Sequence, residues 1–101
     1  MANKTNKTQD YYIIRARGAG VFFGNIKERT GGEITISNAR RLWYWSGAAS
    51  LSQLAVDGVA NPNDCKFTVT VEELIVFDAL EIIKCTDKAI QSINGTREWK
   101  I

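Results

Sequence analysis

The sequence predicts a small α+β domain, in which a mainly antiparallel β-sheet carries two short helices. Short segments alternate apolar and polar residues, glycine-rich turns separate them, and two segments have helical spacing. The 101 residues suffice for one domain with one modest core. Residues 1–10 contain no apolar run and are expected to form a disordered polar tail. The domain is therefore expected to span residues 11–101.

The first strands are predicted on both sides of two glycine-rich segments. Residues 12–17 alternate between apolar and polar side chains, which is typical of a half-buried strand. The glycines within 18–20 permit a bend or bulge, and residues 21–29 begin a second strand with three apolar residues. Paired glycines in 30–32 indicate a hairpin turn, because glycine accepts the positive φ angles of a primed turn. Residues 33–37 then form a third strand.

The middle of the chain is expected to change from strand to helix. Residues 38–39 are predicted to be a second short turn, and residues 40–45 a fourth strand. Leu51 and Leu54 have helical spacing, and Ser50 with Gln53 resembles a capping box. Gly58 is suited to end this helix in the left-handed conformation. Two helical turns are too few to be stable alone, so the helix must be held by packing.

The remainder of the chain contains one clear strand and a segment with two interpretations. A turn at 61–64 precedes residues 66–71, where apolar and polar side chains alternate. Residues 74–77 and 80–85 are apolar and fit either strands or a short helix.

The end of the chain is expected to contain the second helix. Thr86 is placed to cap it, and Asn94-Gly95 to end it. Residues 98–101 are predicted to add an edge strand. The edges of so small a sheet need cover, and self-association is a common solution, so a homo-oligomer is expected.

Composition places the chain among soluble cytoplasmic proteins. Apolar residues make up 45% and charged residues 24%, and the net charge of +2 is too small to indicate a nucleic-acid binder. No apolar stretch near the start indicates a secretory signal, and no window is long enough to span a bilayer. Cys65 and Cys85 form no C-x-x-C pair and are expected to be small core residues.

Catalysis by the commonest routes is not expected. The chain has no histidine, which excludes Ser-His-Asp and Cys-His chemistry and histidine-based zinc sites. The glycines of residues 18–24 have the wrong spacing for a dinucleotide fingerprint and lead into a strand instead of a helix. The following carboxylates are scattered, at positions expected to be solvated: Asp57, Asp64, Glu72, Glu73, Asp78, Glu81 and Asp87. We therefore expect no enzyme, no cofactor and no metal site.

Residues 40–45, RRLWYW, hold two of the three tryptophans beside two arginines. In a strand, Arg41, Trp43 and Trp45 share one face, and residues 40, 42 and 44 share the other. One interpretation is a core face, with arginine stems lying over aromatic rings. The other is an aromatic platform beside fixed positive charge, on which a base stacks and arginines hold phosphate.

Three further residues complete the expected ligand site. Arg15 and Arg17 share a face of the first strand and add positive charge to the same patch, unless they simply form a solvated face. Gln53 lies downstream of the tryptophans and offers hydrogen bonds. The expected ligand is a small nucleotide in a pocket shared between subunits. A single nucleic-acid strand is the alternative, which the low net charge disfavours.

The run RRLWYWSGAASLSQLAVDG, followed by NPNDCKF and VEELIVFDALEIIKCT, resembles a family of small uncharacterised proteins of tailed phages and prophages. The resemblance covers residues 11–101 and implies a phage origin, with the host cytoplasm as the site of action. Small phage proteins often neutralise host defence, and one strategy is a sponge that captures a cyclic nucleotide or an ADP-ribose-type immune signal. The resemblance therefore implies an anti-defence sponge, by analogy of strategy and not of fold.

Two other functions remain open. The aromatic and basic residues are also typical of a protein interface, as in an interaction or virion-accessory protein. A single-stranded nucleic-acid binder is the other alternative, and its affinity would fall steeply with salt.

Overall fold

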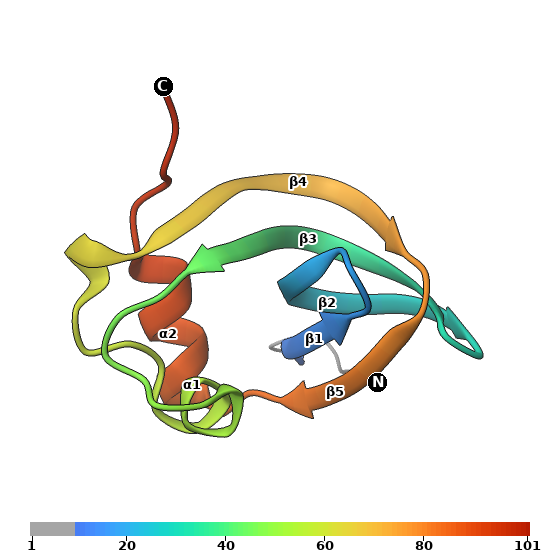
Figure 1. Cartoon of the computed structure of the whole chain (residues 1–101), viewed down its shortest axis with the longest axis horizontal. Helices are drawn as coiled ribbons and strands as arrows, with labels where there is room; N and C mark the ends of the chain where they lie inside the picture. Colours follow the sequence, from blue (N-terminus) through green and yellow to red (C-terminus); the bar gives the residue numbers. More distant parts are fainter. Residues whose placement is uncertain (1–9) are drawn as a thin grey trace, which may run out of the picture.

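The chain folds into five strands and two short helices, which confirms the predicted α+β class (Figure 1). The computed structural model describes residues 10–101, so the predicted tail lies outside it except for Asp10. The elements are β1 (Tyr12–Ala16), β2 (Gly20–Thr30), β3 (Glu33–Tyr44), α1 (Leu51–Asp57), a 3₁₀ turn (Pro62–Asp64), β4 (Lys66–Val76), β5 (Ala79–Lys84) and α2 (Asp87–Gly95). The strands form one antiparallel sheet in the order β4-β3-β2-β1-β5.

The sheet is strongly curled, because its two edge strands are neighbours in the chain (Figure 1). Residues 77–78 alone connect β4 to β5, and Asp78 takes a φ of 56° in this connection. The Ala79 amide donates to the Gly32 carbonyl at 2.9 Å, and the Arg17 amide donates to the Asp78 carbonyl at 3.1 Å. These bonds tie the connection to the β2–β3 hairpin and to the end of β1.

The predicted turn at residues 38–39 is wrong, because β3 continues through it as one long strand. Asn38 takes a φ of 52°, at a point where the pairing of β3 with β2 shifts register. Its side-chain amide donates to the Asn25 side-chain oxygen at 2.8 Å, and Asn25 donates in turn to the Asp10 carbonyl. These bonds satisfy the polar groups of a β-bulge, which bends the strand without ending it.

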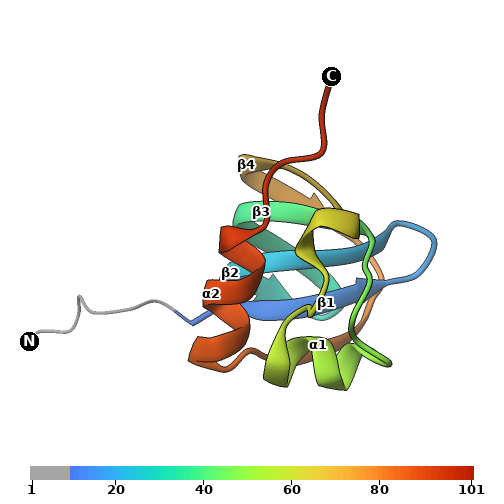
Figure 2. The ribbon, with the colours of Figure 1, turned by 90° about the vertical axis from the view of Figure 1, so that its left-hand side faces the viewer.

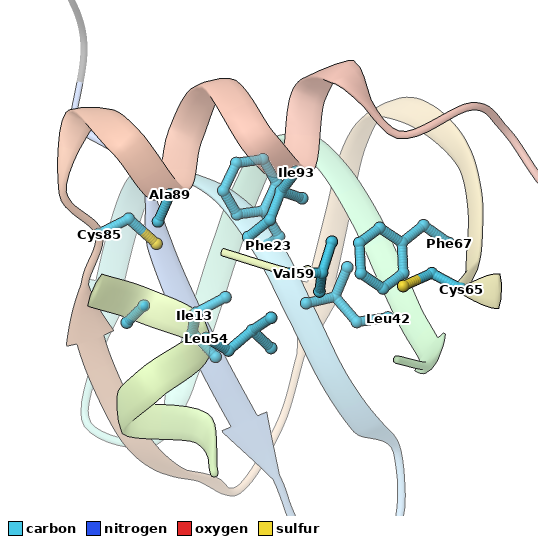
Figure 3. Packing of buried hydrophobic residues seen from close by; sticks show 11 residues of the cluster. Ile13, Phe23, Leu42, Leu54, Val59, Cys65, Phe67, Cys85, Ala89 and Ile93 are labelled. Carbon is cyan, nitrogen blue, oxygen red and sulfur yellow. The ribbon is translucent and has the colours of Figure 1, made fainter. Parts of the chain in front are cut away.

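Two hydrophobic clusters lie on opposite faces of the sheet. The two helices lie over one face of the sheet (Figure 2). The helix-side cluster lies between them and the sheet (Figure 3) and comprises Ile13, Phe23, Leu42, Leu54, Ala55, Val59, Cys65, Phe67, Cys85, Ala89 and Ile93. The inner cluster consists entirely of strand residues, within the curl of the sheet: Ile14, Ala16, Phe22, Ile34, Ile36, Ala39 and Val76. The division follows from alternation, since neighbours in one strand point to opposite faces.

The predicted helix ends are confirmed. The Ser50 hydroxyl accepts from the Gln53 amide at the start of α1. Gly58 ends this helix with a positive φ of 77°, as expected, but its ψ of −147° differs from the expected left-handed helical conformation. The Thr86 hydroxyl accepts from the Ala89 amide at the start of α2. None of the helices in residues 10–101 is long and apolar enough to cross a membrane.

The ambiguous apolar segment proves to be strand. Residues 74–76 continue β4, and residues 79–84 form β5. The predicted edge strand at 98–101 is wrong, because this segment is irregular and one backbone bond, from the Trp99 amide to the Phe67 carbonyl, ties it to β4 at 2.8 Å. Cys65 and Cys85 are buried free thiols, as expected.

Candidate binding site

Trp43, Lys66 and Trp99 form a cluster on the surface, which we call the aromatic–basic cluster. The two indole rings are 5.4 Å apart between centroids, with their planes tilted by 33°. The Lys66 ammonium lies 5.3 Å from the Trp43 ring and 5.4 Å from the Trp99 ring. Trp43 is 60% exposed and Trp99 is 45% exposed, so parts of both rings remain open to a ligand.

Irregular pairing between β3 and β4 places Trp43 in this cluster. Leu42 pairs with Phe67, and Tyr44 pairs with Lys66, so β3 carries one extra residue, Trp43, between the two pairs. An extra residue of this kind has no partner in the neighbouring strand, so its side chain no longer follows the regular alternation between the two faces of the sheet. Trp43 therefore lies beside the beginning of β4.

Arg40 holds the chain that carries Trp99. Its side chain is buried, with 3% of the residue exposed, and its guanidinium donates to three carbonyls, those of Thr68, Ile93 and Thr96. Burial lowers the pKa of Arg40, and the Glu98 carboxylate acts in the opposite direction. An arginine nevertheless stays protonated in proteins, so the three carbonyls keep a charged donor.

An open groove of about 430 Å³ lies next to the cluster. Residues 63–66 and residues 97–100 line the groove. The groove contains the cations of Lys66, Arg97 and Lys100 and the carboxylates of Asp64 and Glu98. Lys100 is paired with Glu98 at 3.5 Å. Lys66 and Arg97 have no carboxylate partner within 4 Å among residues 10–101, so they are available to an anionic ligand.

The structure does not bring Arg41, Trp43 and Trp45 together as one platform. The Arg41 guanidinium lies over the Phe22 ring at 4.9 Å, on the inner-cluster side of the sheet. Trp45 lies beyond the end of β3 and packs against the helix-side cluster. The predicted shared face is therefore wrong, because the extra residue at Trp43 interrupts the alternation on which it depended.

The remaining predicted site residues have other partners. Arg15 pairs with Glu81 at 2.8 Å on the opposite edge of the sheet, and Arg17 lies in the exposed turn that follows β1. The Gln53 side-chain oxygen accepts from the Ala49 amide at 2.8 Å and completes the cap of α1. Of the six predicted residues, Trp43 alone belongs to the aromatic–basic cluster.

Sequence reasoning missed Lys66 and Trp99. The only sequence signal at Trp99 is an aromatic residue between charged ones near the end of the chain, and Lys66 has the appearance of an ordinary exposed strand residue. The pairing of β3 with β4 places Lys66 beside Trp43, and the bond between the Trp99 amide and the Phe67 carbonyl, across more than thirty positions of sequence, places Trp99 there. No local pattern indicates a contact of this range.

A family model described as a domain of unknown function (DUF6948) matches residues 9–93. The matched range contains Trp43 and Lys66 and stops before Trp99. No curated protein and no solved structure matches the chain. Within residues 10–101, no group of three or more Cys, Asp or Glu side chains is arranged to hold a metal ion.

Proposed function

We propose that this chain, which belongs to the DUF6948 family of domains of unknown function, binds a nucleotide-type small molecule and leaves it unchanged. The observation that carries the proposal is the pair of exposed indoles, Trp43 and Trp99, with the Lys66 ammonium beside both. A nucleotide offers a flat base and an anionic phosphate, which are the two groups that this surface complements.

Each part of the ligand has a matching group in the protein. A base that stacks on an indole gains about 1–3 kcal/mol, whichever base it is. The Lys66 ammonium has three donors and no carboxylate partner among the described residues, so it is free to donate to a phosphate oxygen. Arg97, which also lines the groove, adds a planar fork that suits bidentate contact with phosphate.

The proposed biological role is capture of a cyclic nucleotide or an ADP-ribose-type immune signal by a phage protein in the host cytoplasm. This role rests on the resemblance of the chain to phage proteins, whereas the ligand class rests on the aromatic–basic cluster. The groove is open in one protomer. A homo-oligomer in which a second copy covers it would exclude water and hold the ligand more tightly.

Calorimetric titration of the full chain with cyclic dinucleotides and ADP-ribose isomers tests the proposal. We expect one of them to bind and to be recovered unchanged. At about 100 times the dissociation constant, a ligand stabilises the folded state by about 2.7 kcal/mol, which raises Tm by about 10 °C or more in a domain of this size. Absence of heat and of any Tm shift across the panel would contradict the proposal.

Matched variants locate the site. Trp43→Ala and Lys66→Met are each expected to weaken binding about 5-fold or more. Trp45→Phe is the control for the tryptophan, because Trp45 packs against the helix-side cluster. Lys84→Met is the control for the lysine, because Lys84 lies in β5, where it pairs with Asp10. Equal losses in test and control variants would place the ligand elsewhere.

Single-stranded nucleic acid is the second candidate ligand, and the open groove with three basic side chains favours it. Affinity would then increase with oligonucleotide length and fall steeply with salt, because several phosphates release counterions. A mononucleotide that binds as tightly as a ten-residue oligonucleotide would exclude this candidate.

A further inference from the structure

The chain beyond Thr96 is attached to the rest of the protein by few contacts. We call residues 97–101 the arm. In the described part of the chain, one backbone hydrogen bond ties the arm to the sheet, from the Trp99 amide to the Phe67 carbonyl at 2.8 Å. The Lys100–Glu98 ion pair lies within the arm and moves with it. The arm therefore has little to hold it closed besides the Trp99 ring.

Thr96, immediately before the arm, is firmly held. It is buried, its amide donates to the Ile93 carbonyl at 3.1 Å, and its hydroxyl donates to the Ser92 carbonyl at 2.9 Å. Its carbonyl accepts from the Arg40 guanidinium. Thr96 thus makes three hydrogen bonds to the rest of the protein, whereas one backbone hydrogen bond holds the next five residues. The chain can therefore bend immediately after Thr96.

The contacts of Trp99 are compatible with insertion of a ring. The Trp43 centroid, the Trp99 centroid and the Lys66 ammonium form a nearly equilateral triangle, with sides of 5.4, 5.3 and 5.4 Å. Lys66 therefore lies beside the two rings and not between them. A flat ring held between two indoles at ordinary contact distance needs a centroid separation of about 7 Å. A movement of roughly 2 Å at the end of the arm provides this separation.

We infer that the arm is a hinged clamp, which bends after Thr96 and admits a planar base between Trp43 and Trp99, with the anionic group of the ligand beside Lys66. The inference rests on the proposed function and adds to it the insertion of the base and the movement of the arm. In the closed arrangement Trp99 packs against Trp43 with the two ring planes tilted by 33°, and an inserted base replaces that contact with two stacked ones. Trp99 thus serves both as the cover of the empty site and as one wall of the filled site.

Amide hydrogen exchange in the free, full-length chain tests the hinge by NMR. Exchange through local opening is governed by how often a bond breaks. After correction for intrinsic rates, the Trp99 amide is expected to exchange at least about tenfold faster than the Thr96 amide, which is bonded to Ile93. Equal protection of the two amides would overturn the hinge, whether or not a nucleotide binds.

Affinity for ADP-ribose and for a cyclic dinucleotide tests the clamp. Each indole that stacks on the base is expected to raise the affinity about 5- to 150-fold, so Trp99→Ala and Trp43→Ala are each expected to lower it by that factor. Trp99→Phe keeps an aromatic wall and is expected to retain most of the affinity. Unchanged or tighter binding by Trp99→Ala would overturn the clamp and leave the proposed function standing. Failure of the unmodified chain to bind either probe would overturn both.

Discussion

The guanidinium of Arg40 donates a hydrogen bond to the carbonyl of Thr96, which lies 56 positions further along the chain. The same side chain also donates to Thr68 in β4 and to Ile93 in the last turn of α2. One buried arginine thus joins the sheet, the second helix and the start of the arm that carries Trp99. A cation at the C-terminal end of a helix also interacts favourably with the helix dipole.

Arg40→Met is expected to lower the free energy of unfolding by about 3 kcal/mol, because it leaves three carbonyls without their charged donor. Urea denaturation followed by circular dichroism measures the change. Arg41→Met is the matched control. Its guanidinium is exposed and lies over the Phe22 ring, so a loss of about 0.5 kcal/mol is expected. Similar losses in the two variants would contradict the role assigned to Arg40.

Local patterns predicted most of the fold. Alternation located β1 and the beginnings of β3 and β4, an apolar run located β2, and the capping residues Ser50 and Thr86 located both helices. The apolar segment 74–85 stayed ambiguous because both of its strands lie at sheet edges and expose much of their apolar surface. Its assignment as β4 and β5 depends on pairing with β3 and β1, which are distant in the sequence.

The candidate site was predicted far less well than the fold, for a physical reason. The expected platform assumed that Arg41, Trp43 and Trp45 alternate in a regular strand. The pairing of β3 with β4 contains an extra residue at Trp43, and nothing in the local sequence indicates it. Trp43 contacts Lys66 and Trp99, which come from other parts of the chain. Contacts between distant segments are set by tertiary packing, which periodicity does not report.

Gly58→Ala is expected to lower the free energy of unfolding by about 2 kcal/mol or more. Gly58 has a φ of 77°, and a Cβ there would collide with the Ser92 side chain of α2. Backbone strain and the collision act in the same direction. Gly95→Ala in α2 is the control, because no atom lies within 4 Å of its added Cβ and its φ is not positive. Since alanine is the better helix former, this variant is expected to gain about 0.5 kcal/mol in thermal or urea unfolding.

The Cys85 thiol is expected to make stability fall at alkaline pH. Burial raises the pKa of Cys85 to about 12. The unfolded chain loses this proton near pH 8.5, whereas the folded chain keeps it. The contribution of the protonated thiol to the free energy of unfolding is therefore complete below about pH 8.5. It is lost as the pH rises towards 12, at about 1.4 kcal/mol per pH unit. Urea titrations at pH 7.5 and 10 measure the loss, which Cys85→Ala should reduce. An identical pH dependence in this variant would assign the effect to other groups.

Trp43 and Trp45 are expected to differ in both stability and accessibility, although they are two positions apart. Trp45→Ala should lower the free energy of unfolding by about 2–3 kcal/mol, because its ring packs against the helix-side cluster. Trp43→Ala should cost about 1 kcal/mol, since its contacts are the exposed ones with Trp99 and Lys66.

Acrylamide quenching checks the same difference in solution, with variants that retain one tryptophan and carry Phe at the other two positions. The variant that retains Trp43 should be quenched more strongly than the one that retains Trp45. The reverse order would place Trp43 in the core and remove the surface on which the proposed binding site depends.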